Sequence, residues 1–259
     1  MGKIHSSAIV DRSVTLGNGC EIGPYCVVEP GVVLGESCRL DSHVVIKRWT
    51  RIGDSVRVHS GAIIGGDPQD QSFDPEAVSC VEVGADSVLR EGVTVHRSAI
   101  EGGVTRLGKG VYLMGFAHVA HDCVLGDGVV MANGALLAGH VHVGAHSFLG
   151  GGAGIHQFCR IGESVMVGGN AAITKDVPPG LSVVDRNRVI GLNVVGLKRR
   201  GLSGAEVDVY KKAFREFYAE PGTLREKARR RLNGGATLSE WSKRFFEFFL
   251  EGRRGVVVP

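Results

Sequence analysis

Residues 107–149 read LGKGVYLMGFAHVAHDCVLGDGVVMANGALLAGHVHVGAHSFL, and the fold follows from the spacing within them. Beginning at Leu107, every sixth residue of this stretch is Leu, Val or Met. A fixed six-residue period of apolar residues is typical of a parallel β-helix, a solenoid whose coils stack on one another. Three such edges make one triangular coil, and the aliphatic residue of each edge points into the interior.

The same period extends over most of the chain. It runs from Val10 to Ile64, resumes at Val83 after one interruption, and continues to Ile173 with a single miss at Glu101. Roughly 180 residues at about 18 per coil give about ten coils, and a prism about 50 Å long. We therefore predict a mainly β fold, a parallel β-helix over residues 1–184, followed by a small α-helical domain over residues 185–259.

Glycine often follows the inward aliphatic residue. The positions are Gly17, Gly35, Gly53, Gly108, Gly126, Gly144 and Gly162. We expect these glycines to supply the positive φ that a tight corner requires, since glycine adopts it without steric cost.

Two segments interrupt the repeat. Turn-forming residues fill 65–75, and Ile64 and Val83 are 19 residues apart, which predicts that one coil's worth of chain plus one residue leaves the prism as a loop near 67–80. A polar loop on a rigid solenoid often carries binding groups, although a tolerated insertion fits equally well. A second excursion lies near Ser98–Thr105. Pro178 and Pro179 end the coils because proline cannot donate to a ladder.

The C-terminal part has helical signals. Three segments fit a capping box, starting at Ser203, Thr223 and Thr237, and each precedes helix-forming residues. We predict three short helices that carry most of the aromatic side chains. This part is also basic: from Leu197 onward 15 Lys and Arg stand against 8 Asp and Glu, whereas the whole chain has a net charge of +3. Such a tail suits an acidic partner or a phosphate-bearing ligand, or it is a solvated helical surface.

Composition narrows the class of protein. The chain has 259 residues, 43% hydrophobic and only 6% aromatic, with 39 glycines, as suits a narrow aliphatic prism. No apolar run approaches the ~20 residues that a membrane span needs. Five of the six cysteines lie two residues before an inward aliphatic position, which indicates small packing residues rather than ligands or disulfides. We therefore expect a cytoplasmic protein with no membrane span and no nucleic-acid partner.

Histidines are concentrated in one part of the repeat. They are His118, His121, His140, His142 and His156. Because residues 18 apart lie above one another, we expect His121, His140 and His156 to cluster along one edge, with His118 on the same groove. Three interpretations remain open: corner histidines satisfied by hydrogen bonds, a zinc site as in carbonic anhydrase-like β-helices, or a general base oriented by Asp122.

Motifs outside the period resemble the UDP-N-acetylglucosamine O-acyltransferase family of lipid A biosynthesis over essentially the whole chain. These motifs are Gln69-Asp70, His118–Cys123, Ala138–His140, His156–Cys159, Gly168-Gly169, Asp176–Pro179 and Gly196–Gly201. The His-Gln-Phe-Cys and Gly-Leu-Lys-Arg-Arg-Gly stretches are the most specific of them. The resemblance implies a left-handed β-helix, and a homotrimer with active sites between neighbouring prisms.

The resemblance also implies a reaction. A 3-hydroxyacyl chain would move from acyl carrier protein to the 3-hydroxyl of UDP-N-acetylglucosamine, without a cofactor, a metal or an acyl-enzyme. His121 matches the general base, Asp122 its support, and the Gly139 N–H the donor to the oxyanion. Further matches are sugar and acyl contacts at His118, His140 and His156, ligand contacts at Asp70 and Gln157, nucleotide contacts at Asn193, Arg199 and Arg200, and the floor of the acyl groove at Gly169.

The chain departs from the family pattern at three places. Ser72 stands where a lysine is usual, Val195 where a glutamate is usual, and the segment Asp185–Val189 lacks a histidine. These positions concern ribose, uracil and acyl contacts. They leave open N-acyl transfer to a 3-amino nucleotide sugar as an alternative to O-acyl transfer.

Overall fold

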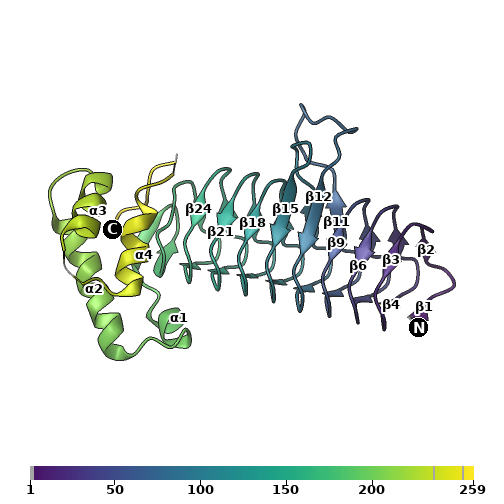
Figure 1. Ribbon diagram of the computed structural model, residues 1–259, viewed down its shortest axis with the longest axis horizontal. Helices are drawn as coiled ribbons and strands as arrows, with labels where there is room; N and C mark the ends of the chain where they lie inside the picture. The colour runs from purple at the N-terminus through teal and green to yellow at the C-terminus, as the bar shows by residue number, and fades with distance from the viewer. Residues whose placement is uncertain (1–2, 236, 253) are drawn as a thin grey trace.

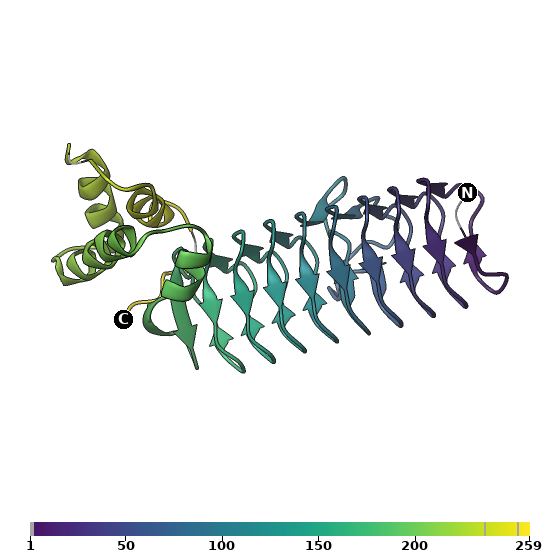
Figure 2. The same ribbon diagram turned by 90° about the horizontal axis from the view of Figure 1, so that it is seen from below.

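The computed structural model is a long triangular prism with a group of helices at its C-terminal end (Figure 1). It describes residues 3–235, 237–252 and 254–259. The view from below shows the strands stacked coil upon coil along the whole prism (Figure 2). This architecture confirms the predicted parallel β-helix of about ten coils with a small helical part after it.

The strands of the described residues form three sheets, one on each face of the prism. The 11-stranded sheet contains β1 (Lys3–Ile4), β4 (Glu21–Ile22), β7 (Arg39–Leu40), β10 (Arg57–Val58), β13 (Val88–Leu89), β16 (Tyr112–Leu113), β19 (Val130–Met131), β22 (Phe148–Leu149), β25 (Met166–Val167), β27 (Leu181–Val184) and β28 (Arg188–Leu192). The nine-stranded sheet contains β2 (Ile9–Val10), β5 (Val27–Val28), β8 (Val45–Ile46), β11 (Ile63–Gly66), β14 (Thr94–His96), β17 (His118–Val119), β20 (Leu136–Leu137), β23 (Gly154–Ile155) and β26 (Ala172–Ile173). The eight-stranded sheet contains β3 (Thr15–Leu16), β6 (Val33–Leu34), β9 (Arg51–Ile52), β12 (Cys80–Val83), β15 (Val104–Leu107), β18 (Val124–Leu125), β21 (His142–Val143) and β24 (Arg160–Ile161).

Strand pairing gives the length of each coil. In regular coils the paired residues are 18 apart, as in Glu21 and Arg39. Across the first interruption they are 31 apart, since Arg57 pairs with Val88, so 13 extra residues leave the prism. The predicted insertion of one coil plus one residue was six residues too long. The 19-residue step from Ile64 to Val83 contains one six-residue edge of the prism, and the other 13 residues form the loop. The second excursion adds six residues, since Thr94 pairs with His118.

The interior contains the predicted aliphatic residues. From Ile22 onward the second residue of each regular strand points inward and is buried, while the first points outward, as the period-2 alternation of a strand requires. The five cysteines in the repeat pack inside the corners as free thiols. Cys26, for example, donates a hydrogen bond from Sγ to the carbonyl oxygen of Asp41 at 2.8 Å. This confirms their interpretation as small packing residues.

The glycines after the inward aliphatic residue have a different role from the one expected. Positive φ occurs two residues later in the corners, for example at Ser37 and His146. At Gly17 a Cβ would lie 2.4 Å from the backbone carbon of Gly35 in the next coil, and at Gly144 it would lie 2.4 Å from the nitrogen of Glu163. Glycine is therefore required because stacked corners approach too closely for any side chain.

The helices are α1 (Val194–Arg199), α2 (Gly204–Ala219), α3 (Leu224–Asn233) and α4 (Glu240–Phe248). Capping boxes open α2 at Ser203 and α3 at Thr223, as predicted. The third start was two residues early, because α4 is capped by Ser239 rather than Thr237, and α1 was missed. Aromatic residues of α2 and α4, including Tyr210 and Phe245, form a core of their own. No helix within the described residues is long and apolar enough to span a membrane.

Candidate active site

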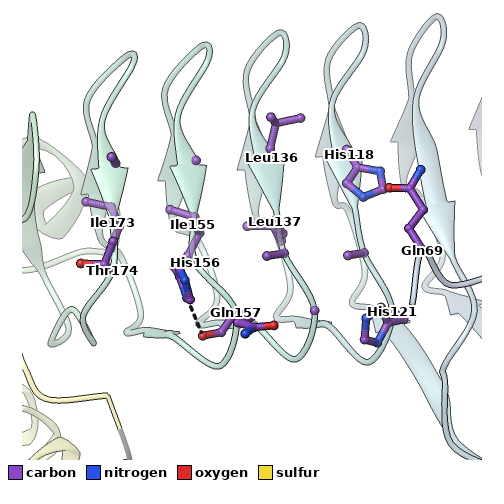
Figure 3. Close-up of a pocket in the computed structure, with 15 residues that line it drawn as sticks. Gln69, His118, His121, Leu136, Leu137, Ile155, His156, Gln157, Ile173 and Thr174 are labelled. Atoms are coloured by element: carbon purple, nitrogen blue, oxygen red, sulfur yellow. Dashed lines mark hydrogen bonds between the residues drawn. The ribbon is translucent and has the colours of Figure 1, made fainter. Parts of the chain in front are cut away.

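The corner between the nine-stranded and eight-stranded sheets carries most of the predicted site. A pocket of about 540 Å³ runs along this corner and the adjoining face of the nine-stranded sheet. Figure 3 shows His118 and His121 on one coil of this pocket, and His156 and Gln157 two coils further along. Its floor is aliphatic, formed by residues such as Leu136 and Ile173. The structure thus provides an apolar groove edged by imidazoles.

His121 and Asp122 form a hydrogen-bonded pair at the mouth of this groove. His121 Nδ1 lies 2.7 Å from Asp122 Oδ2, and both side chains are mostly buried, 15% and 9% exposed. An ionised carboxylate can only accept, so Nδ1 carries the proton and donates it to this bond. The lone pair of Nε2 is then free to accept a proton from a ligand.

The second excursion of the chain holds the carboxylate. Asp122 accepts hydrogen bonds from the Ser98 hydroxyl and from the Ala99 N–H at 3.1 Å, and its own N–H donates to Thr105 Oγ1 at 2.8 Å. Burial alone would raise the pKa of Asp122, but these donors and His121 outweigh it and lower the pKa below its usual range. Ser98 and Thr105 were not predicted as site residues, although the aliphatic position missed at Glu101 marked their segment.

His140 lies on the next coil and contacts the pair from the side. Its ring centroid is 5.1 Å from that of His121 in an edge-on arrangement, and its Nε2 is 3.7 Å from Asp122 Oδ2. The ring of Phe158 stacks on His140 at 4.6 Å. The possible ligand atoms of His121, Asp122 and His140 lie within 4.8 Å of one another, so this group is also the candidate metal site of the described residues.

Gly139 lies directly against the His121 ring. A Cβ at this position would lie 2.6 Å from Cε1 and 2.7 Å from Nε2 of His121. The absence of a side chain therefore leaves the open nitrogen of His121 accessible. Among the described residues the Gly139 N–H has no hydrogen-bond partner, whereas the neighbouring His140 N–H donates to the His121 carbonyl oxygen at 3.0 Å.

His118 is held by two residues of β14. Its Nδ1 lies 2.7 Å from Thr94 Oγ1, and its ring meets the ring of His96 edge-on at 4.8 Å. Burial lowers the pKa of His96 to about 4, with a smaller contribution from the neighbouring His118 and His121. Burial also lowers the pKa of His118. Both imidazoles are therefore neutral near pH 7.

The extruded loop brings Gln69 into the lining of the pocket. Gln69 is one of the lining residues and lies near His118 in Figure 3. The exposed Asp70 carboxylate accepts two hydrogen bonds within the loop, from the N–H of Ser72 at 2.9 Å and from its hydroxyl at 2.8 Å. Ser72, where the family pattern has lysine, therefore caps its own loop. The Ser72 hydrogen bonds lower the pKa of Asp70, and His121 and His140 are near enough to add to this effect. The role of Asp70 as a ligand contact stays a prediction.

A buried arginine ties this loop to the prism. The Arg97 side chain is fully buried and donates to Asp67 at 2.8 Å, to the Pro75 carbonyl oxygen at 3.1 Å and to the Ala77 carbonyl oxygen. Its guanidinium also lies 4.8 Å from the centroid of the Phe73 ring. These contacts join the start and the end of the loop, so the position of Gln69 depends on Arg97, a residue that no pattern in the sequence had singled out.

The predicted nucleotide-binding residues lie in a second pocket. Asn193, Arg199 and Arg200 line a cavity of about 550 Å³ against outward side chains of the 11-stranded sheet, such as Phe148. The side-chain amide of Asn193 makes two hydrogen bonds within the chain: it accepts one from the Gly196 N–H at 3.0 Å and donates one to the Ser164 carbonyl oxygen at 2.9 Å.

Gly169 also lies away from the His121 groove. It sits at the corner between β25 and β26 and does not line that pocket. One chain therefore does not bring all the predicted residues together.

Known proteins are similar to this chain over nearly its whole length. Residues 176–257 match a family model described as UDP N-acetylglucosamine O-acyltransferase, domain 2, and residues 105–139 match the bacterial transferase hexapeptide repeat. A relative from Aquifex aeolicus, named acyl-(acyl-carrier-protein)–UDP-N-acetylglucosamine O-acyltransferase, is 53% identical over 98% of this chain and 97% of its own length. One of the same name from Sulfurihydrogenibium sp. (strain YO3AOP1) is 58% identical over 87% of this chain and 84% of its own length. The LpxA structure from Acinetobacter baumannii superposes with a TM-score of 0.93 at 32% identity, covering 98% of this chain and 99% of that one.

Proposed function

This chain belongs to the UDP-N-acetylglucosamine O-acyltransferase family, whose β-helix is left-handed, and we propose that it acylates the 3-hydroxyl of UDP-N-acetylglucosamine. The acyl donor is a 3-hydroxyacyl chain on acyl carrier protein, and the product enters lipid A biosynthesis as its first intermediate. The observation that supports this proposal best is the His121–Asp122 pair, which has a free Nε2 at the mouth of an apolar groove.

The pair is suited to general-base catalysis. His121 Nε2 takes the proton of the sugar 3-hydroxyl while that oxygen attacks the thioester carbonyl carbon. The carboxylate of Asp122 stabilises the imidazolium that forms and keeps the ring in the Nδ1–H tautomer. When the tetrahedral intermediate collapses, the C–S bond breaks and the imidazolium returns the proton to the departing sulfur. A thioester is already activated, so the step needs no acyl-enzyme.

Gly139 is suited to stabilise the negative charge. Its N–H lies beside His121 and has no partner among the described residues, so it is available to the carbonyl oxygen of the thioester. Removing a single oxyanion donor typically costs about 10²- to 10³-fold in kcat. A backbone donor also adds no flexible group to the groove.

We further propose that the active enzyme is a homotrimer with its sites between prisms. The acyl and base residues lie on the nine-stranded sheet, whereas Arg199 and Arg200 lie against the 11-stranded sheet of the same chain. A substrate that contacts both sets must therefore bridge two chains. Outward positions of the nine-stranded sheet also form an exposed apolar row, with Ile9 69% and Leu136 48% exposed, which a neighbouring prism would cover.

The zinc interpretation is less well supported by the geometry of Asp122. Both of its oxygens already accept hydrogen bonds, from Ser98 on one side and from Ala99 and His121 on the other. To bind a metal, this carboxylate would have to give up donors that the fold supplies. The residues therefore favour a base over a metal centre.

Acceptor identity separates the main proposal from N-acyl transfer to a 3-amino sugar. An amine is a better nucleophile and depends less on a base than a hydroxyl does. A single-turnover assay should use acyl carrier protein loaded with a 3-hydroxyacyl chain as the donor. It should offer UDP-N-acetylglucosamine and its 3-amino analogue as acceptors in the same mixture. We expect an ester product from the first sugar. Formation of an amide alone would overturn the O-acyltransferase proposal.

We also place this reaction in the cytoplasm, where acyl carrier protein occurs. The six cysteines are free thiols, and each is buried. A chain that packs thiols in this way suits a reducing compartment. Fractionation of cells that express the tagged protein would test this placement.

A further inference from the structure

The C-terminal tail returns from the helices to the end of the prism. Asp176 donates its N–H to the Gly255 carbonyl oxygen at 2.8 Å, and the Val257 N–H donates to the Asp176 carbonyl oxygen at 2.9 Å. Val257 is 1% exposed and belongs to the core of the β-helix. The tail also passes so close to the prism that a Cβ at Gly252 would lie 2.4 Å from Asp176 Oδ2. The backbone on both sides of Arg254 is therefore docked.

From this docked segment Arg254 reaches the His-lined groove. Its Nε donates to the Gln157 carbonyl oxygen at 3.0 Å, and its Nη2 lies 3.1 Å from His156 Nδ1. Its guanidinium also lies 5.9 Å from the centroid of the Phe158 ring, which stacks on His140. One side chain thus contacts three consecutive residues of a single corner, almost a hundred residues earlier in the sequence.

These contacts select the tautomer of His156. A guanidinium has only donors, so Nδ1 of His156 must accept and the ring proton lies on Nε2. The competing contact is longer: Nδ1 also lies 3.3 Å from the Gln157 carbonyl oxygen, drawn as a dashed line in Figure 3. That oxygen already accepts from Arg254. Without Arg254, the Nδ1–H tautomer would gain this carbonyl as its acceptor.

We propose that Arg254 is a positioning residue of the groove, which fixes His156 as an Nε2–H donor and holds the Gln157 corner in place. His156 and Gln157 line the groove, so the fixed donor is available to an oxygen of a bound ligand. This inference rests on the proposed acyl transfer for its kinetic consequence, but the tautomer itself is independent of any activity. It also assigns the C-terminal tail to the active site rather than to the helical part alone.

The first test is a side-chain ¹⁵N spectrum of the whole protein labelled at histidine, at about pH 8, where an ordinary imidazole is neutral. His156→Asn assigns the His156 signals by their loss. We expect His156 to be an Nε2–H tautomer in the native chain and to shift toward Nδ1–H in Arg254→Gln. A native His156 in the Nδ1–H form would overturn the proposal, whatever the protein acylates.

The second test is kinetic. Arg254→Gln should lower kcat/KM by about tenfold, the order expected for one hydrogen bond to a charged group. Arg254→Lys, which cannot donate to both acceptors in the same plane, should lie between Arg254→Gln and the native protein. Arg39→Gln is the matched control, because its exposed guanidinium pairs with Glu21 on the N-terminal coils. An Arg254→Gln protein with native kcat/KM and a native His156 tautomer would refute the positioning role.

Discussion

The carboxylate of Asp122 accepts a hydrogen bond from Nδ1 of His121 at 2.7 Å, although the two residues are neighbours in the chain. Adjacent side chains meet here because Asp122 has a positive φ of 59°, which turns its side chain back over the corner. A non-glycine residue in this region is uncommon in proteins, but other corners of this β-helix have it too, for example at Ser37 and His140. The β-helix stabilises this backbone conformation of Asp122, because the coils stacked on both sides hold the corner in place.

Replacement of His121 by alanine should nearly abolish turnover. Loss of a general base typically costs about 10²- to 10⁴-fold in rate. The side chain lines a groove instead of filling the core, so the thermal transition should remain close to that of the native protein. Single-turnover rates and thermal unfolding curves of the two proteins provide the measurement. A large loss of thermal stability would instead indicate that His121 is a structural histidine.

A Gly139→Ala protein should lose most of its activity without unfolding. The added methyl carbon would lie 2.6 Å from Cε1 of His121 and would push the ring out of line with its substrate. We expect kcat to fall by about 10²-fold or more, since a small misplacement of a catalytic group has effects of this size. Gly204→Ala at the start of α2, where an added Cβ meets nothing within 4 Å, is the control. Native activity in Gly139→Ala would contradict the role assigned to the ring position.

Replacement of Cys123 by alanine should leave activity intact. Burial raises the pKa of this thiol to about 12, and Sγ donates to the Ala138 carbonyl oxygen at 3.2 Å inside the prism. A buried, protonated thiol cannot serve as a nucleophile. The substitution should cost roughly 1 kcal/mol of unfolding free energy through lost packing. A folded but inactive Cys123→Ala protein would point to a thiol mechanism.

Acidification should destabilise the fold through His96. Its pKa is about 4 in the folded chain because it is buried, against 6.5 in a solvated imidazole. The unfolded chain therefore binds a proton first as pH falls, so the stability that His96 contributes is complete above about 6.5 and is lost as pH falls toward about 4.

His96→Gln removes this titration and should make the stability less dependent on pH over that window. Urea unfolding of both proteins at about pH 7.5 and about pH 5 measures the difference. His118, whose pKa is also lowered, continues to titrate in the variant. An equal loss of stability in the two proteins would show that His96 is not the group responsible.

The six-residue period was sufficient to predict the β-helix and its inward residues, because each aliphatic position contributes to a single continuous core. It also indicated which histidines would lie on one edge, since stacked coils turn an 18-residue spacing into spatial proximity. The supports from Ser98, Arg97 and Arg254 were not predictable. They come from excursions or from the tail, whose paths are set by side-chain contacts and not by any period in the sequence.

Which residues line the groove was harder to predict than the fold. The resemblance selected Asp70, and the loop also brings its neighbour Gln69 into the lining of the groove. Gly169 and Arg199 matched a ligand site but lie away from His121 on this chain. A sequence match does not say which chain of an assembly supplies a residue.

The most direct test is a crystal structure of the protein with UDP-N-acetylglucosamine bound. We predict that the sugar 3-oxygen lies within hydrogen-bond distance, about 3 Å, of His121 Nε2. We also predict that the nucleotide lies on Arg199 and Arg200 of a neighbouring chain. A sugar bound with its 3-oxygen away from His121, or a metal ion held by His121, Asp122 and His140, would contradict general-base catalysis by His121.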